Sequence, residues 1–211
     1  MIKIFSCGLL DTNTYVVWEE RSKEGMIIDC GVEPLTVLRY VEEQRLKIRY
    51  VVLTHGHFDH AEYVEEYEKL FREAEIICHE DEKAVLYDME ANLSIWGKRP
   101  RAYDCKYTYV KEGDVLSLGK GGIGQKSGEE CMNFQILHTP GHTPGCICLY
   151  NERDKIMFTG DTLFKRSYGR TDFKYGDSRL MYSSLKRLYS MDPGIVFYPG
   201  HYQSSVIGDE I

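Results

Sequence analysis

The segment 54–60 reads THGHFDH and carries four side chains of the kinds that bind metal ions, namely His55, His57, Asp59 and His60. Imidazole and carboxylate ligands together suit zinc, iron or manganese, whereas clusters of oxygen ligands alone suit calcium or magnesium. A short histidine-rich segment can also be an exposed turn without function. A metal site at this segment therefore needs further ligands elsewhere in the chain.

Three more side chains of these kinds stand in loop-like segments. His142 lies in TPGHTPG at 139–145, Asp161 is the last residue of the TGD that ends an apolar run, and His201 follows the last apolar run. Each comes just after a predicted strand, as 54–60 does, and loops at strand ends are the usual place for functional side chains. We therefore expect these residues at one edge of a sheet sandwich, where six or seven ligands indicate a dinuclear site.

Short apolar and β-branched runs between turn residues predict the strands that would position this site. The runs are 2–5, 14–18, 25–29, 48–53, 75–78, 111–118, 133–138, 145–150, 155–159 and 195–198. Apolar residues at helical spacing predict one helix that begins at Glu33 and three more at 61–71, 80–89 and 180–188. The segment 119–130 is glycine-rich and polar, which predicts a surface loop.

Composition excludes several classes of partner. The 211 residues fit one domain or two small ones, and the net charge of −7 offers no basic surface for nucleic acid. No apolar run approaches the roughly 20 residues that cross a bilayer, and the first residues turn polar too early for a signal peptide. We expect a cytoplasmic protein without a membrane partner, either a monomer or a homodimer. The seven cysteines include no CxxC pair, which favours buried free thiols.

Four segments occur in the order found in the metallo-β-lactamase superfamily. They are HGHFDH at 55–60, TPGHTPG at 139–145, TGDTLF at 159–164 and PGH at 199–201. Within that superfamily the sequence resembles the glyoxalase II-like hydrolases, and in particular their single-domain YcbL type. The resemblance extends over nearly the whole chain. It implies one α/β (α+β) domain over 1–211, a four-layer αββα sandwich with metals in a cleft along one edge.

The resemblance also implies how the ligands divide. One metal ion would be held by His55, His57 and His142, the other by Asp59, His60 and His201, and Asp161 would bridge the two. The ions would be divalent, with zinc expected and iron or manganese as alternatives. Asp59 and Asp161 are the predicted catalytic residues. His79 and His138 fall outside the set, and we predict structural roles for both, with a role in supporting the metal ligands as the alternative.

The implied reaction is hydrolysis of a thioester of the hydroxyacylglutathione type by a hydroxide that bridges the two metals. The thiolate leaves readily, because a free thiol has a pKa of about 8.5. Glyoxalase II holds glutathione with a lysine and a tyrosine, whose matching positions here are Arg170 and Asp172, so the thiol is left open. Lys165, Arg166 and Arg170 are candidate substrate-binding residues, although Arg170 and Asp172 could equally be scaffold.

Two other functions remain open from the sequence. A persulfide dioxygenase shares these motifs but would use one iron held by His55, His142 and Asp161. A non-catalytic, metal-dependent binding protein is disfavoured because every ligand position is filled. Flavodiiron proteins carry a glutamate at the position of His57, and zinc β-lactamases lack a bridging aspartate, so both branches are disfavoured as well.

Overall fold

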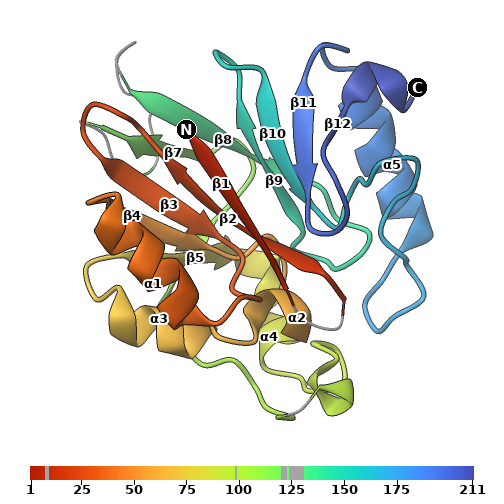
Figure 1. Ribbon diagram of the computed structural model, residues 1–211. Helices are drawn as coiled ribbons and strands as arrows, with labels where there is room; N and C mark the ends of the chain where they lie inside the picture. The colour runs from red at the N-terminus through yellow and green to blue at the C-terminus, as the bar shows by residue number, and fades with distance from the viewer. Residues whose placement is uncertain (8–9, 98, 120–122, 124–130) are drawn as a thin grey trace.

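Two six-stranded sheets pack face to face, with helices on their outer faces (Figure 1). The computed structural model describes residues 1–7, 10–97, 99–119, 123 and 131–211. The first sheet has the order β1-β2-β3-β4-β5-β6. Its strands are β1 (Ile2–Cys7), β2 (Thr12–Trp18), β3 (Glu24–Ile28), β4 (Lys47–Val52), β5 (Glu75–His79) and β6 (Tyr107–Val110).

The second sheet has the order β12-β11-β10-β9-β8-β7. Its strands are β7 (Val115–Leu118), β8 (Met132–His138), β9 (Ile147–Asn151), β10 (Ile156–Gly160), β11 (Val196–Pro199) and β12 (Ser205–Val206). The α-helices are α1 (Pro34–Glu43), α2 (Phe58–Ala61), α3 (Val64–Leu70), α4 (Lys83–Leu86) and α5 (Ser178–Tyr189). Single 3₁₀ turns are η1 (Glu80–Glu82), η2 (Ser94–Trp96) and η3 (Ile207–Asp209).

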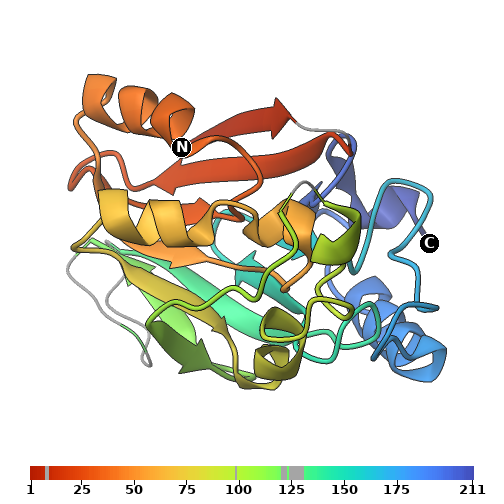
Figure 2. The same ribbon diagram turned by 90° about the horizontal axis from the view of Figure 1, so that it is seen from below.

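Three apolar layers hold the sandwich together. The inner layer lies between the sheets and includes Val17, Val52 and Phe158. A second layer packs α1 and α3 on the first sheet, and a third packs α5 on the second sheet. Both views show α1 and α3 on one outer side and α5 on the other (Figures 1 and 2). The predicted four-layer αββα sandwich is thus confirmed.

Parallel pairing brings several strand ends to one edge. β3, β4 and β5 are mutually parallel neighbours, and so are β10 and β11. Backbone hydrogen bonds join the two sheets at this edge. The Asn13 N–H donates to the Gly200 carbonyl at 2.7 Å, and the Ile147 N–H donates to the Thr54 carbonyl at 3.0 Å. The segments that follow β4, β10 and β11 therefore meet.

Two predicted helices differ from the observed ones. The helix expected over 61–71 begins earlier, at Phe58, and is interrupted before α3, because the Tyr63 N–H donates to the Cys30 carbonyl instead of continuing the helix. The helix expected over 80–89 is a 3₁₀ turn followed by the four residues of α4. It ends there because Asp88 Oδ1 accepts the N–H groups of Glu90 and Ala91, which forms a turn.

Other predictions concern loops and cysteines. The predicted surface loop 119–130 lies outside the described residues, except for Gly119 and Ile123. Six cysteines are buried free thiols, as expected: Cys30, Cys78, Cys105, Cys131, Cys146 and Cys148. Within the described ranges, no helix is long and apolar enough to span a bilayer.

Candidate metal centre

The fold brings all seven predicted ligands together at the shared edge of the two sheets. Their nitrogen and carboxylate oxygen atoms form three overlapping groups, in each of which the ligand atoms lie within 4.8 Å of one another. The groups are His55 with His57 and His142, His55 with His60 and Asp161, and Asp59 with His60 and His201. The first and third groups are the two sets that the sequence resemblance implies for two separate ions.

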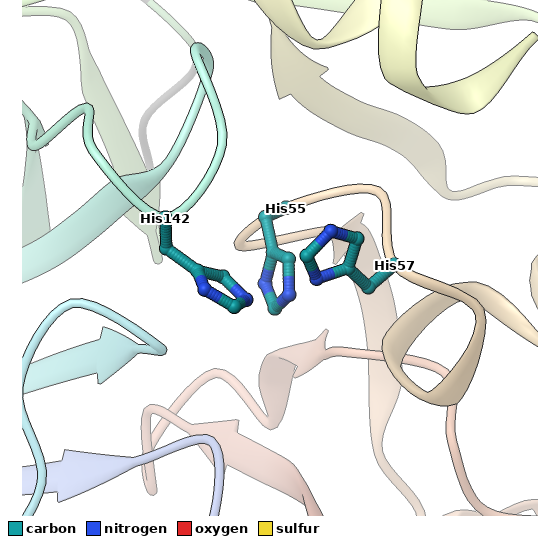
Figure 3. A group of neighbouring side chains, drawn as sticks. All are labelled: His55, His57 and His142. Carbon is teal, nitrogen blue, oxygen red and sulfur yellow. The ribbon is translucent and has the colours of Figure 1, made fainter. Parts of the chain in front are cut away.

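The first group shows how residues from different segments converge. His55 and His57 come from the loop after β4, and His142 comes from the loop between β8 and β9. Figure 3 shows the three imidazole rings turned toward a common space. The ring centroid of His57 lies 4.8 Å from that of His55 and 4.5 Å from that of His142.

Unpaired buried atoms at this place fit bound metal ions. Among the described residues, the Nε2 atoms of His55, His57 and His142 are buried and have no hydrogen-bond partner, and the same holds for Asp161 Oδ1. Leaving a buried polar atom unpaired costs about 1–3 kcal/mol, so native proteins rarely do so without a ligand. The clusters therefore fit a dinuclear metal site, for which imidazole and carboxylate are suitable donors.

Hydrogen bonds at Nδ1 orient three of the rings. The Nδ1 of His142 donates to the Arg170 carbonyl at 2.7 Å, and that of His201 donates to the Leu10 carbonyl at 2.9 Å. His60 Nδ1 lies 2.8 Å from Asp29 Oδ2, a carboxylate oxygen that can only accept a hydrogen bond, so His60 Nδ1 is the donor. With the proton held at Nδ1, each ring presents the lone pair of Nε2 to the centre. Such bonds fix the tautomer of metal-binding histidines.

Asp161 lies between the two sides of the centre. Its Oδ2 is 3.4 Å from Nε2 of both His142 and His201, and its Oδ1 is 3.3 Å from His60 Nε2. Burial would raise the pKa of this carboxyl, but His60 and His201 outweigh burial and hold the pKa well below its usual range. Asp161 is therefore a carboxylate that faces both sides, which is the position a bridging ligand requires.

Asp59 belongs to the side formed by His60 and His201. Its Oδ2 accepts a hydrogen bond from the Thr12 hydroxyl at 2.8 Å and lies 3.2 Å from His201 Nε2. Burial opposes ionisation, yet His60 and His201 lower the pKa of Asp59 to about 2. Conversely, the carboxylates of Asp161 and Asp59 overcome burial and raise the pKa of His201 to about 10. Without a metal ion, His201 is thus a cation paired with these carboxylates, and a divalent ion would displace its Nε2 proton and take over the pairing.

Burial acts differently on the other side. It lowers the pKa of His55 and of His57 well below that of free imidazole, and neighbouring histidines lower it further. Both rings are consequently neutral at physiological pH. Neutral imidazole is the form that binds a metal ion.

Two buried acids near the ligands were not predicted from the sequence. Asp29, directly after β3, accepts hydrogen bonds through both carboxylate oxygens. Its Oδ2 accepts from His60 Nδ1 at 2.8 Å, and its Oδ1 accepts from the Thr54 N–H at 2.7 Å. Its position after a strand at the same edge was the available signal. Glu82 accepts from the Gly56 N–H at 2.7 Å and from the Gly145 N–H at 2.8 Å, which ties together the two loops that carry the first histidine group. No local pattern marks Glu82.

The predicted substrate-binding residues lie around the centre. Lys165 and Arg166 are exposed and, with Ser167, Tyr202 and Gln203, line an open cavity of about 440 Å³. The Arg170 guanidinium makes two hydrogen bonds of 2.7 Å to Asp172, while its carbonyl orients His142. The backbone of Arg170 thus has a positioning role that the sequence did not indicate.

His79 and His138 lie outside the seven-residue centre and stack on each other. Their ring centroids are 3.9 Å apart, and the rings are inclined by 11°. His79 Nδ1 accepts from the Asp81 N–H, and His138 Nε2 donates to the Pro144 carbonyl at 2.8 Å. No metal-type neighbour of His79 was predicted from the sequence, whereas the fold places Asp81 and His138 beside it. One ligand atom of each of these three residues lies within 4.8 Å of the others, but His79 Nδ1 and His138 Nε2 are already engaged in hydrogen bonds.

Comparisons with known proteins add to this geometry. The profile of the Metallo-beta-lactamase superfamily matches residues 7–201. The hydroxyacylglutathione hydrolase GloC of Haemophilus influenzae is 30% identical over 211 residues, which cover 99% of this chain and 94% of that protein. The crystal structure of the BLEG-1 B3 metallo-beta-lactamase gives a TM-score of 0.85 at 28% identity, covering 100% of this chain and 96% of that chain. The crystal structure of TTHA1623 in a di-iron-bound form gives a TM-score of 0.82 at 28% identity, covering 99% of this chain and 96% of that chain.

Proposed function

Because the chain belongs to the metallo-beta-lactamase superfamily, we propose that it is a two-metal hydrolase that cleaves a thioester of the hydroxyacylglutathione type. The observation that carries this proposal is that four buried ligand atoms of these His/Asp groups have no hydrogen-bond partner among the described residues. The similarity to GloC over almost the full length of both chains supports a thioester as the substrate.

The ligands would divide between the two ions as the resemblance implies. His55, His57 and His142 would hold one ion, Asp59, His60 and His201 the other, and Asp161 both. When bound, two divalent ions supply a water of lowered pKa and polarise the substrate carbonyl. Asp161 joins the two sides because its Oδ2 lies 3.4 Å from Nε2 of both His142 and His201. Thr12 holds the Asp59 carboxylate against His201. Zinc, iron and manganese all suit these donors.

The cavity beside His201 suits the anionic half of such a substrate. Phe164 contacts both His201 and Tyr202, with ring centroids 5.8 and 5.6 Å apart, so the cavity that Tyr202 lines adjoins the second histidine side. Lys165 and Arg166 give this cavity positive charge. A glutathione-like thiol carries carboxylates that would pair with these cations.

The test measures metal content and thiol release on the same purified protein. We expect two metal ions per chain and release of glutathione from S-lactoylglutathione. Asp161→Ala should lower kcat/KM at least about 100-fold and reduce the metal content, since a ligand that faces both sides is removed. Asp192→Ala, at an exposed carboxylate paired with Lys155, is the matched control and should leave both unchanged.

A persulfide dioxygenase is the second candidate. His142 Nε2 lies 3.4 Å from Asp161 Oδ2, and with His55 these residues could form the two-histidine, one-carboxylate arrangement of mononuclear iron oxygenases. One iron per chain with oxygen uptake on glutathione persulfide would replace the hydrolase proposal. A β-lactam belongs in the same assay because one structural neighbour is a metallo-beta-lactamase. A fully metallated protein without any of these activities would indicate a binding function.

A further inference from the structure

Two aromatic side chains, Trp96 and Phe173, stand beside the first histidine group, and we call them the aromatic wall. The Phe173 ring lies edge-on to His57, with centroids 5.7 Å apart, and 6.4 Å from the His142 ring. Trp96, in η2, contacts Phe173 with centroids 5.6 Å apart and an interplanar angle of 61°. The wall therefore continues directly from two proposed metal ligands.

The Phe173 end of the wall is held in place by its own segment. The Arg170 guanidinium lies 4.1 Å from the Phe173 ring centroid, a cation–π contact, and its two hydrogen bonds to Asp172 fix the plane of the guanidinium. The Arg170 carbonyl accepts from His142 Nδ1. Arg170 thus orients a metal ligand through its carbonyl and supports the wall next to that ligand through its side chain.

A charged contact joins the two segments that form the wall. Lys174 Nζ lies 2.8 Å from Asp88 Oδ2 and 2.9 Å from Glu90 Oε2, which connects the segment of Phe173 to the segment that leads to Trp96. Neither aromatic residue belongs to the hydrophobic core clusters among the described residues. The Lys174 contact therefore holds together residues at the surface and not residues of the hydrophobic core.

Trp96 is unusually exposed for its type. Its relative exposure is 65%, although large aromatic side chains are mostly buried. A single exposed apolar residue needs no explanation, but Tyr87, Met89 and Ile95 of the same segment are exposed as well. An apolar surface that begins at a metal centre can shield the apolar part of a substrate from water.

The two sides of the centre thus differ in polarity. The side of His201 adjoins the cavity lined by Lys165 and Arg166, whereas the side of His57 and His142 adjoins the aromatic wall. A thioester has two ends, and its carbonyl must lie at the metals. An anionic thiol half on the cationic side places the acyl group against the wall.

We propose that the aromatic wall binds the acyl group of the thioester and, among straight acyl chains, favours long apolar ones over the acetyl group. This inference rests on the proposed function, because it assigns one end of the substrate of that reaction. Hydrolysis breaks the C–S bond and forms a C–O bond with water. It releases a fatty carboxylate, a thiol and one proton.

The test compares glutathione thioesters of straight-chain acids from acetyl to octanoyl. We expect kcat/KM to be about 10- to 60-fold higher for octanoyl than for acetyl, because each half-buried methylene contributes about a factor of two. Trp96→Ala should reduce this ratio below about threefold. Tyr182→Ala removes an aromatic side chain of similar exposure, 70%, from α5 and should leave the ratio unchanged. A ratio near one in the unsubstituted enzyme, or an unchanged ratio in Trp96→Ala, overturns the proposal.

A binding measurement separates failure of the wall from failure of the thioester reaction. The chain has two tryptophans, of which Trp18 is buried and Trp96 exposed. Octanoate should change the tryptophan fluorescence saturably where acetate does not, and Trp96→Phe should abolish the change. If no thioester is cleaved but octanoate binds in this way, the proposed reaction fails and the wall stands. If thioesters are cleaved but octanoate leaves Trp96 unaffected, the wall fails, and a protein or lipid partner becomes the occupant to test.

Discussion

Substituting asparagine for Asp29 should weaken metal binding on the His60 side without changing a ligand. Asparagine keeps the shape of aspartate and tolerates the left-handed backbone at this position, where φ is 62°. Its amide, however, offers one acceptor and one donor group in place of two acceptors. The Thr54 N–H and His60 Nδ1 both need an acceptor, at 2.7 and 2.8 Å. An NH₂ group facing His60 would place the ring proton on Nε2, the atom that must bind the metal.

The size of the effect follows from the bond that is lost. Changing a hydrogen-bond partner of a metal-binding histidine typically costs about 10- to 100-fold in metal affinity, which equals about 1.4–2.7 kcal/mol. The first histidine group should be less affected. Its link to Asp29 is indirect and runs through Thr54, whose hydroxyl lies 2.9 Å from Asp29 Oδ2 and 3.2 Å from His55 Nδ1.

Competition against a chromophoric chelator measures both affinities. We expect one site of Asp29→Asn to weaken about 10- to 100-fold and the other to change less than about threefold. Asp192→Asn makes the same chemical change at an exposed carboxylate that pairs with Lys155 at 2.7 Å, and it should bind both ions normally. If both metal affinities of Asp29→Asn lie within about twofold of those of the unsubstituted protein, the idea that Asp29 fixes the tautomer of His60 is refuted.

Two further substitutions test the supports of the centre. Burial raises the pKa of Glu82 to about 7, against the opposing effect of the donors that contact it. Since this folded-state pKa is raised, the stability that Glu82 contributes below its unfolded pKa of about 4.5 is lost as pH rises toward 7. Glutamine at position 82 does not titrate, so the Glu82→Gln variant does not share this loss. The amount by which its unfolding free energy falls below that of the unsubstituted protein should therefore shrink by about 1–3 kcal/mol between pH 5 and 8. A difference that stays the same at both pH values in denaturant titrations would contradict this. In Gly200→Ala the new Cβ would overlap Asp161 Oδ1 and come within 2.6 Å of His60 Cε1, so metal analysis should find at least one ion per chain lost. Gly194→Ala, whose Cβ would meet only the Asp192 carboxylate at 3.2 Å, is the control, and two tightly bound ions in Gly200→Ala would disprove the clash.

Much of the fold and of the ligand set could be predicted from the sequence because the signals are local. Apolar runs that alternate with turn residues mark the strands, and the types of the residues just after them mark candidate ligands. Parallel neighbours end at the same edge, so His55, Asp161 and His201 could be expected there together. Their convergence with His142 in the structure has this simple cause.

What the sequence could not reveal depends on contacts between distant segments. The interruption between α2 and α3 arises because the Cys30 carbonyl captures the Tyr63 N–H, a bond that helical periodicity does not contain. Asp29 and His60 are 31 residues apart, and Thr143 and Glu82 are 61 apart.

The sequence by itself thus determined which residues are chemically able to bind metal and which strand ends carry them, since both follow from residue type and short-range spacing. Only the tertiary structure decided which proton each imidazole keeps, because Asp29 and the Arg170 carbonyl reach His60 and His142 from other parts of the chain. It also placed Phe173 against His57. Partners of this kind are set by how the two sheets pack, and packing is a property of the whole fold.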